Sequence, residues 1–378
     1  MSYEIALPTE GYFLREFIIT ALAFISQKSG AKLTVNVDKA ILEVPSLSRV
    51  ATSYAALIRQ FHQVESIFVT TDHKAPKQKI ITEISRLTNK KASTPSEAMI
   101  NYAEWVESEA SNVNVLLSSL AKLTYPGPGE EGVLYYGENR KRLIAAPQIL
   151  KANFSYCKRV FGKPSKAEVK LDIHALSLAL TGALIARVGV RREERRRVTI
   201  YLSLLDPGAY NFWNETKNIL KDVECRTAPE VIFRVLLAFK LKVPGILPMR
   251  FFEIESGMKP LAYSYHEVAI DRGLVEFVNN LPEYCCLQLI NLFMYALRNW
   301  REPPAKTRPI LITAYKLALA IYMTTGGLMK PGEMLYSVAR DTYATVGKEF
   351  EEALKNAKID IDLEDFEKLI RDIYESLT

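Results

Sequence analysis

The residues best able to do chemistry in this sequence are basic. Six arginines fall within eleven positions, namely Arg187, Arg191, Arg192, Arg195, Arg196 and Arg197. A guanidinium can bind a phosphate through two parallel hydrogen bonds, whereas a lysine ammonium acts as a point charge. The cluster therefore predicts contact with a nucleic-acid backbone. Glu193 and Glu194 interrupt the run, and a turn neutralised by its own carboxylates is the alternative interpretation.

A second basic cluster follows two neighbouring tyrosines in a glycine-rich stretch. Tyr135 and Tyr136 precede Arg140, Lys141 and Arg142. An exposed loop that offers aromatic rings beside cations could stack a base and neutralise a phosphate at once. The alternative is a solvated loop with partly buried tyrosines. Lys158 and Arg159 add further positive charge between the two clusters and complete the predicted nucleic-acid-binding set.

The distribution of charge is lopsided along the chain. The net charge is +6, but residues 126–210 hold fifteen basic and eight acidic residues. Residues 349–378 hold ten acidic and four basic residues. A localised excess of this kind indicates an anionic partner for the central segment. The acidic end is either a solvated helix face or a surface for a protein partner.

No pattern in the sequence indicates a catalytic site, a metal site or a cofactor. The four histidines are scattered, and the order GPGEEG-VLYY is the reverse of a phosphate-binding loop. Asp172 and His174 stand too close together to share a helix face. We therefore expect a protein that is not an enzyme. A nuclease whose carboxylates meet only in the fold, and a purely structural adaptor, are the alternatives.

The remaining bulk features favour a cytoplasmic protein without a membrane segment. No apolar stretch reaches the roughly 18 uncharged residues that a membrane span needs. Cys285 and Cys286 stand together in an apolar helical run, which is typical of core positions, and none of the four cysteines forms a CxxC pair.

The periodicity predicts an α+β fold that is mainly helical. The first 45 residues predict a strand, a helix and a hairpin, and helices follow from Ser46 to about Tyr125, with Ser46 and either Thr94 or Ser96 as caps. Two prolines and four glycines between Pro126 and Gly137 mark a break in the chain.

The central and C-terminal parts differ in their predicted elements. Helices are expected over 146–161 and 171–190, then a strand that ends at Asp206, and a hairpin that turns at Ser256–Gly257. After about Leu274 four helices predict an antiparallel bundle. The expected parts are a mixed N-terminal part over 1–125, a basic central part with strands over 126–273 and the helical bundle over 274–378.

The centre of the chain, over 171–208, reads LDIHALSLALTGALIARVGVRREERRRVTIYLSLLDPG. With this stretch at its centre, the order of the parts resembles the large subunit of the archaeal subtype I-A CRISPR interference (Cascade) complex. The likeness covers most of the chain in order and length, and that family has no short signature motif. It implies a non-catalytic subunit that contacts the handle of the guide RNA and the flank (protospacer-adjacent motif) of double-stranded target DNA. It also implies other complex subunits and a helicase–nuclease as partners.

Overall fold

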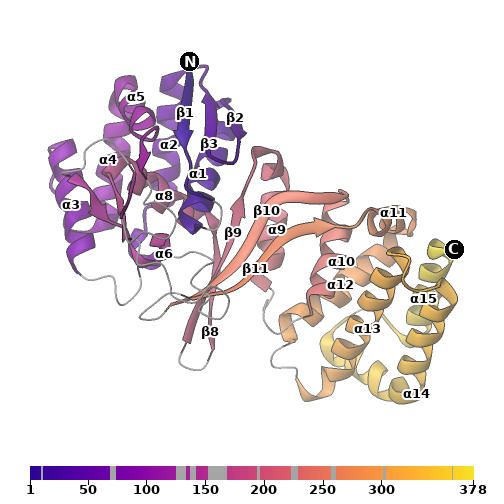
Figure 1. The fold of residues 1–378 in the computed structure, drawn as a ribbon. Coiled ribbons are helices and arrows are strands. Elements are labelled where there is room, and N and C mark those ends of the chain that lie inside the picture. Colours follow the sequence, from indigo (N-terminus) through magenta and orange to yellow (C-terminus); the bar gives the residue numbers. More distant parts are fainter. Residues whose placement is uncertain are drawn as a thin grey trace. The chain divides into compact units, whose positions relative to one another are not determined.

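The computed structural model describes residues 1–9, 12–68, 74–124, 133–136, 142–151, 168–193, 196–222, 229–256, 261–300, 304–359 and 361–378. The chain forms two compact units (Figure 1). The first unit comprises 1–211 and 248–267, and the second comprises 212–247 and 268–378. The fold is α+β and mainly helical, as the sequence predicts. The three parts expected from composition remain a prediction.

The N-terminal strand, helix and hairpin are confirmed. Strand β1 (Ser2–Ala6) is followed by helix α1 (Phe13–Ser29) and by strands β2 (Lys32–Val35) and β3 (Lys39–Glu43). The strands form an antiparallel sheet in the order β1-β3-β2. Helix α1 ends at Gly30, whose φ of 73° is a left-handed conformation that glycine adopts without strain.

A group of helices follows as expected. They are α2 (Leu47–Gln60), the short 3-10 helix η1 (Val64–Ile67), α3 (Lys74–Thr88), α4 (Pro95–Ser108) and α5 (Ala110–Ser119). Ser46 caps α2 by accepting the Arg49 N–H, and Thr94 rather than Ser96 caps α4, with Pro95 in its first turn.

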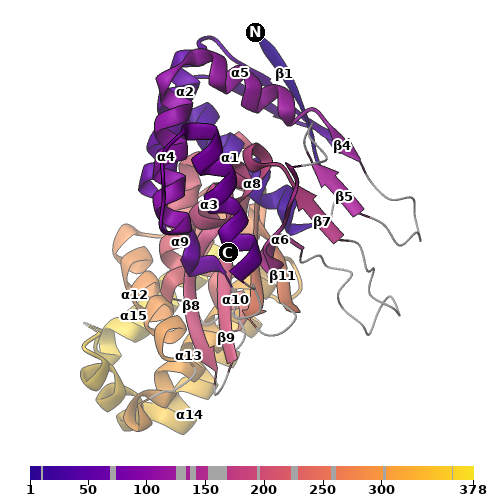
Figure 2. The same ribbon diagram turned by 90° about the vertical axis from the view of Figure 1, so that its left-hand side faces the viewer.

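A second sheet has the order β4-β5-β7-β6. Its strands are β4 (Leu123–Thr124), β5 (Val133–Tyr136), β6 (Ile144–Ala145) and β7 (Glu168–Leu171). Figure 2 shows β4, β5 and β7 side by side, and the pairing of β5 with β7 is parallel. The helix expected over 146–161 is present as α6 (Gln148–Lys151), and residues 152–161 lie outside the described residues.

Helix α8 (Ile173–Ala186) ends four residues before the expected position, and strand β8 (Arg187–Glu193) begins there. The prediction of a helix as far as Val190 is therefore wrong. Residues 173–186 show no polar face, because nearly all of them are buried, so a change in hydrophobic period does not indicate where the helix ends. Strand β9 (Arg196–Leu204) follows, then the 3-10 turn η4 (Pro207–Ala209), which Asp206 caps.

The third sheet has the order β11-β10-β9-β8. It adds β10 (Gly245–Ser256) and β11 (Leu261–Ile270), which form the predicted second hairpin. Helix α1 packs on this sheet, where Phe13 stacks on Phe252 with ring centroids 4.5 Å apart and Phe17 contacts Tyr201. On its other side α1 meets α8 so closely that a Cβ added at Gly182 would lie 1.8 Å from the Phe17 carbonyl oxygen.

The second unit is helical in its described residues, apart from the ends of β10 and β11. It holds α9 (Tyr210–Asp222) from Phe212 onward, α10 (Glu230–Leu241), α11 (Arg272–Asn280), α12 (Glu283–Asn299), η5 (Ala305–Thr307), α13 (Arg308–Thr325), α14 (Pro331–Ala357) and α15 (Leu363–Leu377). The C-terminal helices expected from the sequence are thus present, and each from α12 to α15 contacts the next. Within the part of the chain that the structure describes, no helix is both long and apolar enough to cross a membrane.

Candidate nucleic-acid interface

The arginine cluster lies on two paired strands rather than in a simple turn. Strands β8 and β9 form an antiparallel hairpin in which Arg191 pairs with Val198, Arg192 with Arg197 and Glu193 with Arg196. Residues 194 and 195, and with them Arg195, lie outside the described residues. The hairpin therefore carries arginines on both strands toward its end.

The register of this hairpin opposes two like charges. Glu193 is the register partner of Arg196 across the ladder, and the self-neutralised alternative stays open. Arg192, however, stands directly opposite Arg197, and like charges at opposite positions of an antiparallel pair destabilise it.

The base of the hairpin is fixed to the short helix η1 by two of the predicted arginines. Arg187 Nη1 donates to Ser66 Oγ at 2.6 Å, and Arg197 Nη2 reaches the Ser66 carbonyl oxygen at 3.4 Å. Arg187 is half-buried, whereas Arg197 is exposed. Arg187 therefore holds the hairpin to η1, and Arg197 is the more exposed of the two.

The predicted exposed tyrosine loop is wrong for Tyr136. Both tyrosines belong to strand β5, and the Tyr136 ring is fully buried, with its hydroxyl donating to the Ala6 carbonyl oxygen. Leu134, two positions earlier, is also fully buried, so one face of β5 turns into the core. The Tyr135 side chain, Arg140, Lys141, Lys158 and Arg159 lie outside the described residues.

Arg142 is exposed and lines a pocket of about 400 Å³. The remaining walls come from three helices: Glu83, Arg86 and Leu87 of α3, Val115 and Ser119 of α5, and the start of α8 at Asp172, Ile173 and His174. Asp172 caps α8 by accepting the Ala175 N–H at 2.8 Å, and its own N–H donates to the Tyr136 carbonyl oxygen. The buried end of β5 thus sets where α8, and with it His174, begins.

His174 is the most constrained side chain of this pocket. Its ring is 9% exposed, stacks on Trp105 and has Nδ1 2.8 Å from the Tyr102 hydroxyl. Burial lowers the pKa of His174 to about 4, so the ring is neutral at physiological pH. The sequence contains only a weak signal for this site, because His174 lies some seventy residues from its partners Tyr102 and Trp105.

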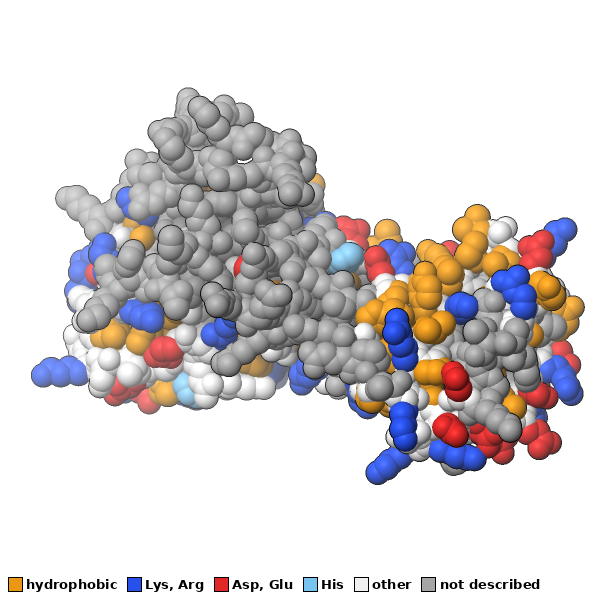
Figure 3. All heavy atoms as spheres, turned by 90° about the horizontal axis from the view of Figure 1, so that it is seen from below, with side chains coloured by type: hydrophobic (Ala, Val, Ile, Leu, Met, Phe, Trp, Pro, Cys, Tyr) orange, Lys and Arg blue, Asp and Glu red, His pale blue; other side chains and the backbone are white. Residues whose placement is uncertain are grey.

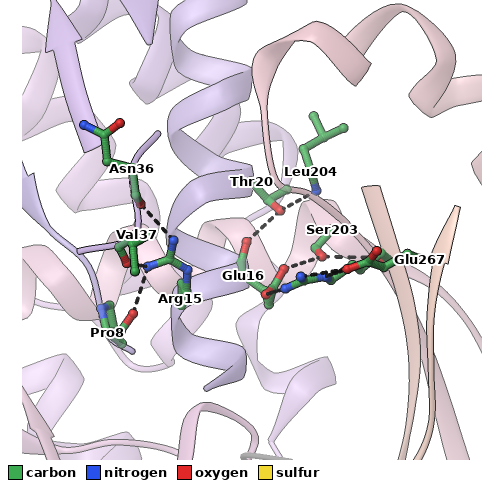
Figure 4. A network of polar contacts seen from close by, with 10 residues as sticks. Pro8, Arg15, Glu16, Thr20, Asn36, Val37, Ser203, Leu204 and Glu267 are labelled. Carbon is green, nitrogen blue, oxygen red and sulfur yellow. Dashed lines mark hydrogen bonds and ion pairs between the residues drawn. The ribbon is translucent and has the colours of Figure 1, made fainter. Parts of the chain in front are cut away.

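A second pocket, of about 480 Å³, lies beside a buried ionic network (Figure 4). Arg15 donates to the carbonyl oxygens of Pro8, Asn36 and Val37. Arg250 donates to Glu16 Oε1 at 3.0 Å and to Glu267 Oε1 at 2.8 Å. Both guanidiniums are therefore engaged within the fold.

The carboxylate of Glu16 joins α1 to β9 and β10. Glu16 is fully buried and accepts from Ser203 Oγ at 2.9 Å as well as from Arg250. Burial raises the pKa of Glu16, while Arg250 and Ser203 act in the opposite direction. The network serves the fold, because its charges are paired with one another.

The remaining chemistry-bearing residues form no metal-binding cluster in the described chain. Among the described residues, no three His, Cys, Asp or Glu side chains lie together as metal ligands would. Cys285 and Cys286 are free and buried on α12, as the sequence predicts. On the side of the second unit seen in Figure 3, hydrophobic side chains gather beside charged ones.

No protein-family model matches the chain, and no curated protein matches it.

Proposed function

We propose that this protein binds nucleic acid without cleaving it, as the large subunit of a CRISPR RNA-guided DNA interference complex. In that role it contacts the guide RNA handle and the flank of double-stranded target DNA, and helps to recruit the helicase–nuclease. The observation that supports nucleic-acid binding is the opposition of Arg192 and Arg197 in the β8–β9 hairpin. A phosphate backbone is the anion that suits guanidiniums arrayed along a ladder.

The experiment measures the affinity of the purified chain for RNA and for duplex DNA by fluorescence anisotropy, from about 50 mM to about 200 mM salt. The test variant replaces Arg191, Arg192 and Arg196 by alanine and leaves Arg187 in place, because Arg187 holds Ser66. The matched control replaces the exposed Lys28, Lys32 and Lys91, which removes the same charge elsewhere in the first unit.

The hairpin variant should weaken binding across all sequences and lower the slope of log affinity against log salt by about 0.9 for each phosphate contact that is lost. The lysine control should bind nearly as the wild type does. Absence of binding at about 50 mM salt, both by the chain and by its native assembly, would refute the proposal. Magnesium-dependent cleavage by the pure chain would favour a nuclease instead.

The assignment to a guide complex has its own test. The native assembly should contain a short RNA of uniform length together with other subunits. An assembly that lacks RNA, and whose subunits still associate after the hairpin arginines are removed, would indicate a structural adaptor.

A further inference from the structure

The pocket lined by Arg142 has the size and enclosure of a small-molecule site. Its volume of about 400 Å³ lies within the roughly 300–1,000 Å³ typical of such sites and far exceeds the needs of an inorganic phosphate. Two of its helices, α3 and α8, contact each other, and Figure 2 shows α3 in front of α8 with the strands β5 and β7 beside them. The walls thus come from elements that pack together within the first unit.

Among the described residues of the pocket, one cation is available to a ligand. Arg86 forms an ion pair with Glu83 one turn away, and Asp172 is held by its cap to Ala175. Within the chain as described, no hydrogen bond or ion pair engages Arg142. Arg142 is therefore the side chain that can donate two parallel hydrogen bonds to an incoming phosphate.

The two carboxylates limit how much negative charge the ligand can bring. Among the described lining residues, Glu83 and Asp172 balance the charges of Arg86 and Arg142, so this part of the pocket is formally neutral. A polyphosphate would meet repulsion from the carboxylates, whereas a single phosphate on a largely neutral body would not. The same carboxylates can accept hydrogen bonds from amino or hydroxyl groups of that body.

His174 adds a directional contact from the inner wall. Its Nδ1 is occupied by the Tyr102 hydroxyl, and among the described residues its Nε2 has no hydrogen-bond partner. The ring is more than nine-tenths buried and is held in place by stacking on Trp105. A fixed, neutral imidazole is suited to the edge of a base or to a ribose hydroxyl rather than to a phosphate.

We propose that this pocket binds one nucleoside monophosphate unit, with its phosphate at Arg142 and its base or sugar toward His174. The unit is either an unstacked nucleotide of the bound strand or a free mononucleotide. The first of these rests on the function proposed above and extends it, because it gives the protein a site that holds a single nucleotide out of the stack.

The test uses a variant that fills the pocket without disturbing the core. Val115 lines the pocket and is 50% exposed, so Val115→Trp places an indole at the mouth. Ser111→Trp is the matched control, since Ser111 is exposed on the same helix α5 and does not line the pocket. Thermal unfolding followed by circular dichroism checks that both variants keep the fold.

The strand measurement uses a short RNA that carries 2-aminopurine, whose fluorescence rises when the base leaves the stack. Wild type and Ser111→Trp should raise this fluorescence several-fold, whereas Val115→Trp and Arg142→Ala should abolish the rise at protein concentrations at which anisotropy shows the RNA to be fully bound. A rise that persists in Val115→Trp would overturn the strand form of the proposal.

The second measurement is equilibrium dialysis with AMP and, separately, with inorganic phosphate. AMP binding that Val115→Trp abolishes supports the pocket even if no strand binds, in which case the function proposed above fails and the pocket stands as a mononucleotide site. Phosphate binding as tight as that of AMP would overturn the assignment of a nucleotide. Absence of AMP binding together with absence of an unstacking signal would overturn the proposal altogether.

Discussion

The hydroxyl of Tyr102 and Nδ1 of His174 lie 2.8 Å apart, which links helix α4 to the first turn of α8. Both side chains are buried, and burial raises the pKa of Tyr102 while it lowers that of His174. Both groups therefore stay uncharged over a wide range of pH. Protonation of the imidazole would place a charge inside this buried wall of the Arg142 pocket.

Acid should destabilise the protein through His174. Between pH 6.5 and about pH 4 the unfolded chain binds a proton on this imidazole and the folded chain does not, so the free energy of unfolding falls as the pH falls. The full loss is roughly 3 kcal/mol for a shift of this size. Denaturant unfolding at pH 7 and pH 4.5 measures it.

The variant His174→Gln should lose most of that dependence on pH between 6.5 and 4. Because wild type and variant differ at one position, the other titrating groups, Glu16 among them, contribute to both chains alike. An unchanged dependence in the variant would show that His174 is protonated in the folded protein.

We expect the Glu16–Arg250 ion pair to contribute to the free energy of unfolding. Arg250→Met leaves the fully buried Glu16 carboxylate without its cation and should cost about 3–5 kcal/mol. Glu267→Gln is the control, because the Glu267 side chain is 42% exposed and its loss should cost under about 1 kcal/mol.

The double variant Glu16→Gln/Arg250→Met should recover part of the loss, since it removes the stranded charge. Urea denaturation of wild type, Glu16→Gln, Arg250→Met and the double variant gives the coupling energy. Equal losses for Arg250→Met and Glu267→Gln would contradict a buried ion pair at Glu16.

The contact between α1 and α8 should not tolerate a methyl group at Gly182. The added Cβ would lie inside the backbone of Phe17, so Gly182→Ala forces the two helices apart and should cost at least about 3 kcal/mol. Gly189→Ala on β8 meets nothing within 4 Å and should leave the melting temperature unchanged. Similar melting temperatures for the two variants would mean that the helices lie farther apart than the structure has them.

Because Tyr136 is buried, we expect it to stabilise the fold and not to bind nucleic acid as the sequence predicts. Tyr136→Phe removes the hydroxyl that donates to Ala6 and should cost about 1 kcal/mol, with nucleic-acid affinity unchanged. Tyr3→Phe removes an exposed hydrogen bond to Asn114 and should cost less. If Tyr136→Phe lowered the affinity for nucleic acid without a change in stability, Tyr136 would belong to the binding interface after all.

The elements that the sequence predicts well are those with a clear period or cap. Alternating residues on both sides of Asp38–Lys39 specify the first hairpin, and Ser46 and Thr94 specify where α2 and α4 begin. The end of α8 is missed because residues 173–186 show no polar face from which a change of period could be read.

The Arg142 pocket is missed for a different reason. Apart from Arg142, its residues come from α3, α5 and the start of α8, and each of these contributes only one or two polar groups. No local spacing of residues in the sequence therefore predicts the pocket. Tyr136 is missed because its partner strand β7 begins more than thirty residues later, and the prolines and glycines before β5 suggest a loop. Such relationships depend on tertiary packing, which a local pattern does not encode.

The division of the chain has a consequence for its synthesis on the ribosome. The polypeptide passes between the two units three times, after Asn211, Leu247 and Glu267. Strand β9 therefore emerges with one edge unpaired, and Tyr201 lacks its stacking partner Phe252 until α9 and α10 have also been made. Because nascent chains grow N-terminus first at roughly 5–20 residues per second, that edge stays open for seconds. A fragment ending at Asn211 would keep it open permanently and should aggregate.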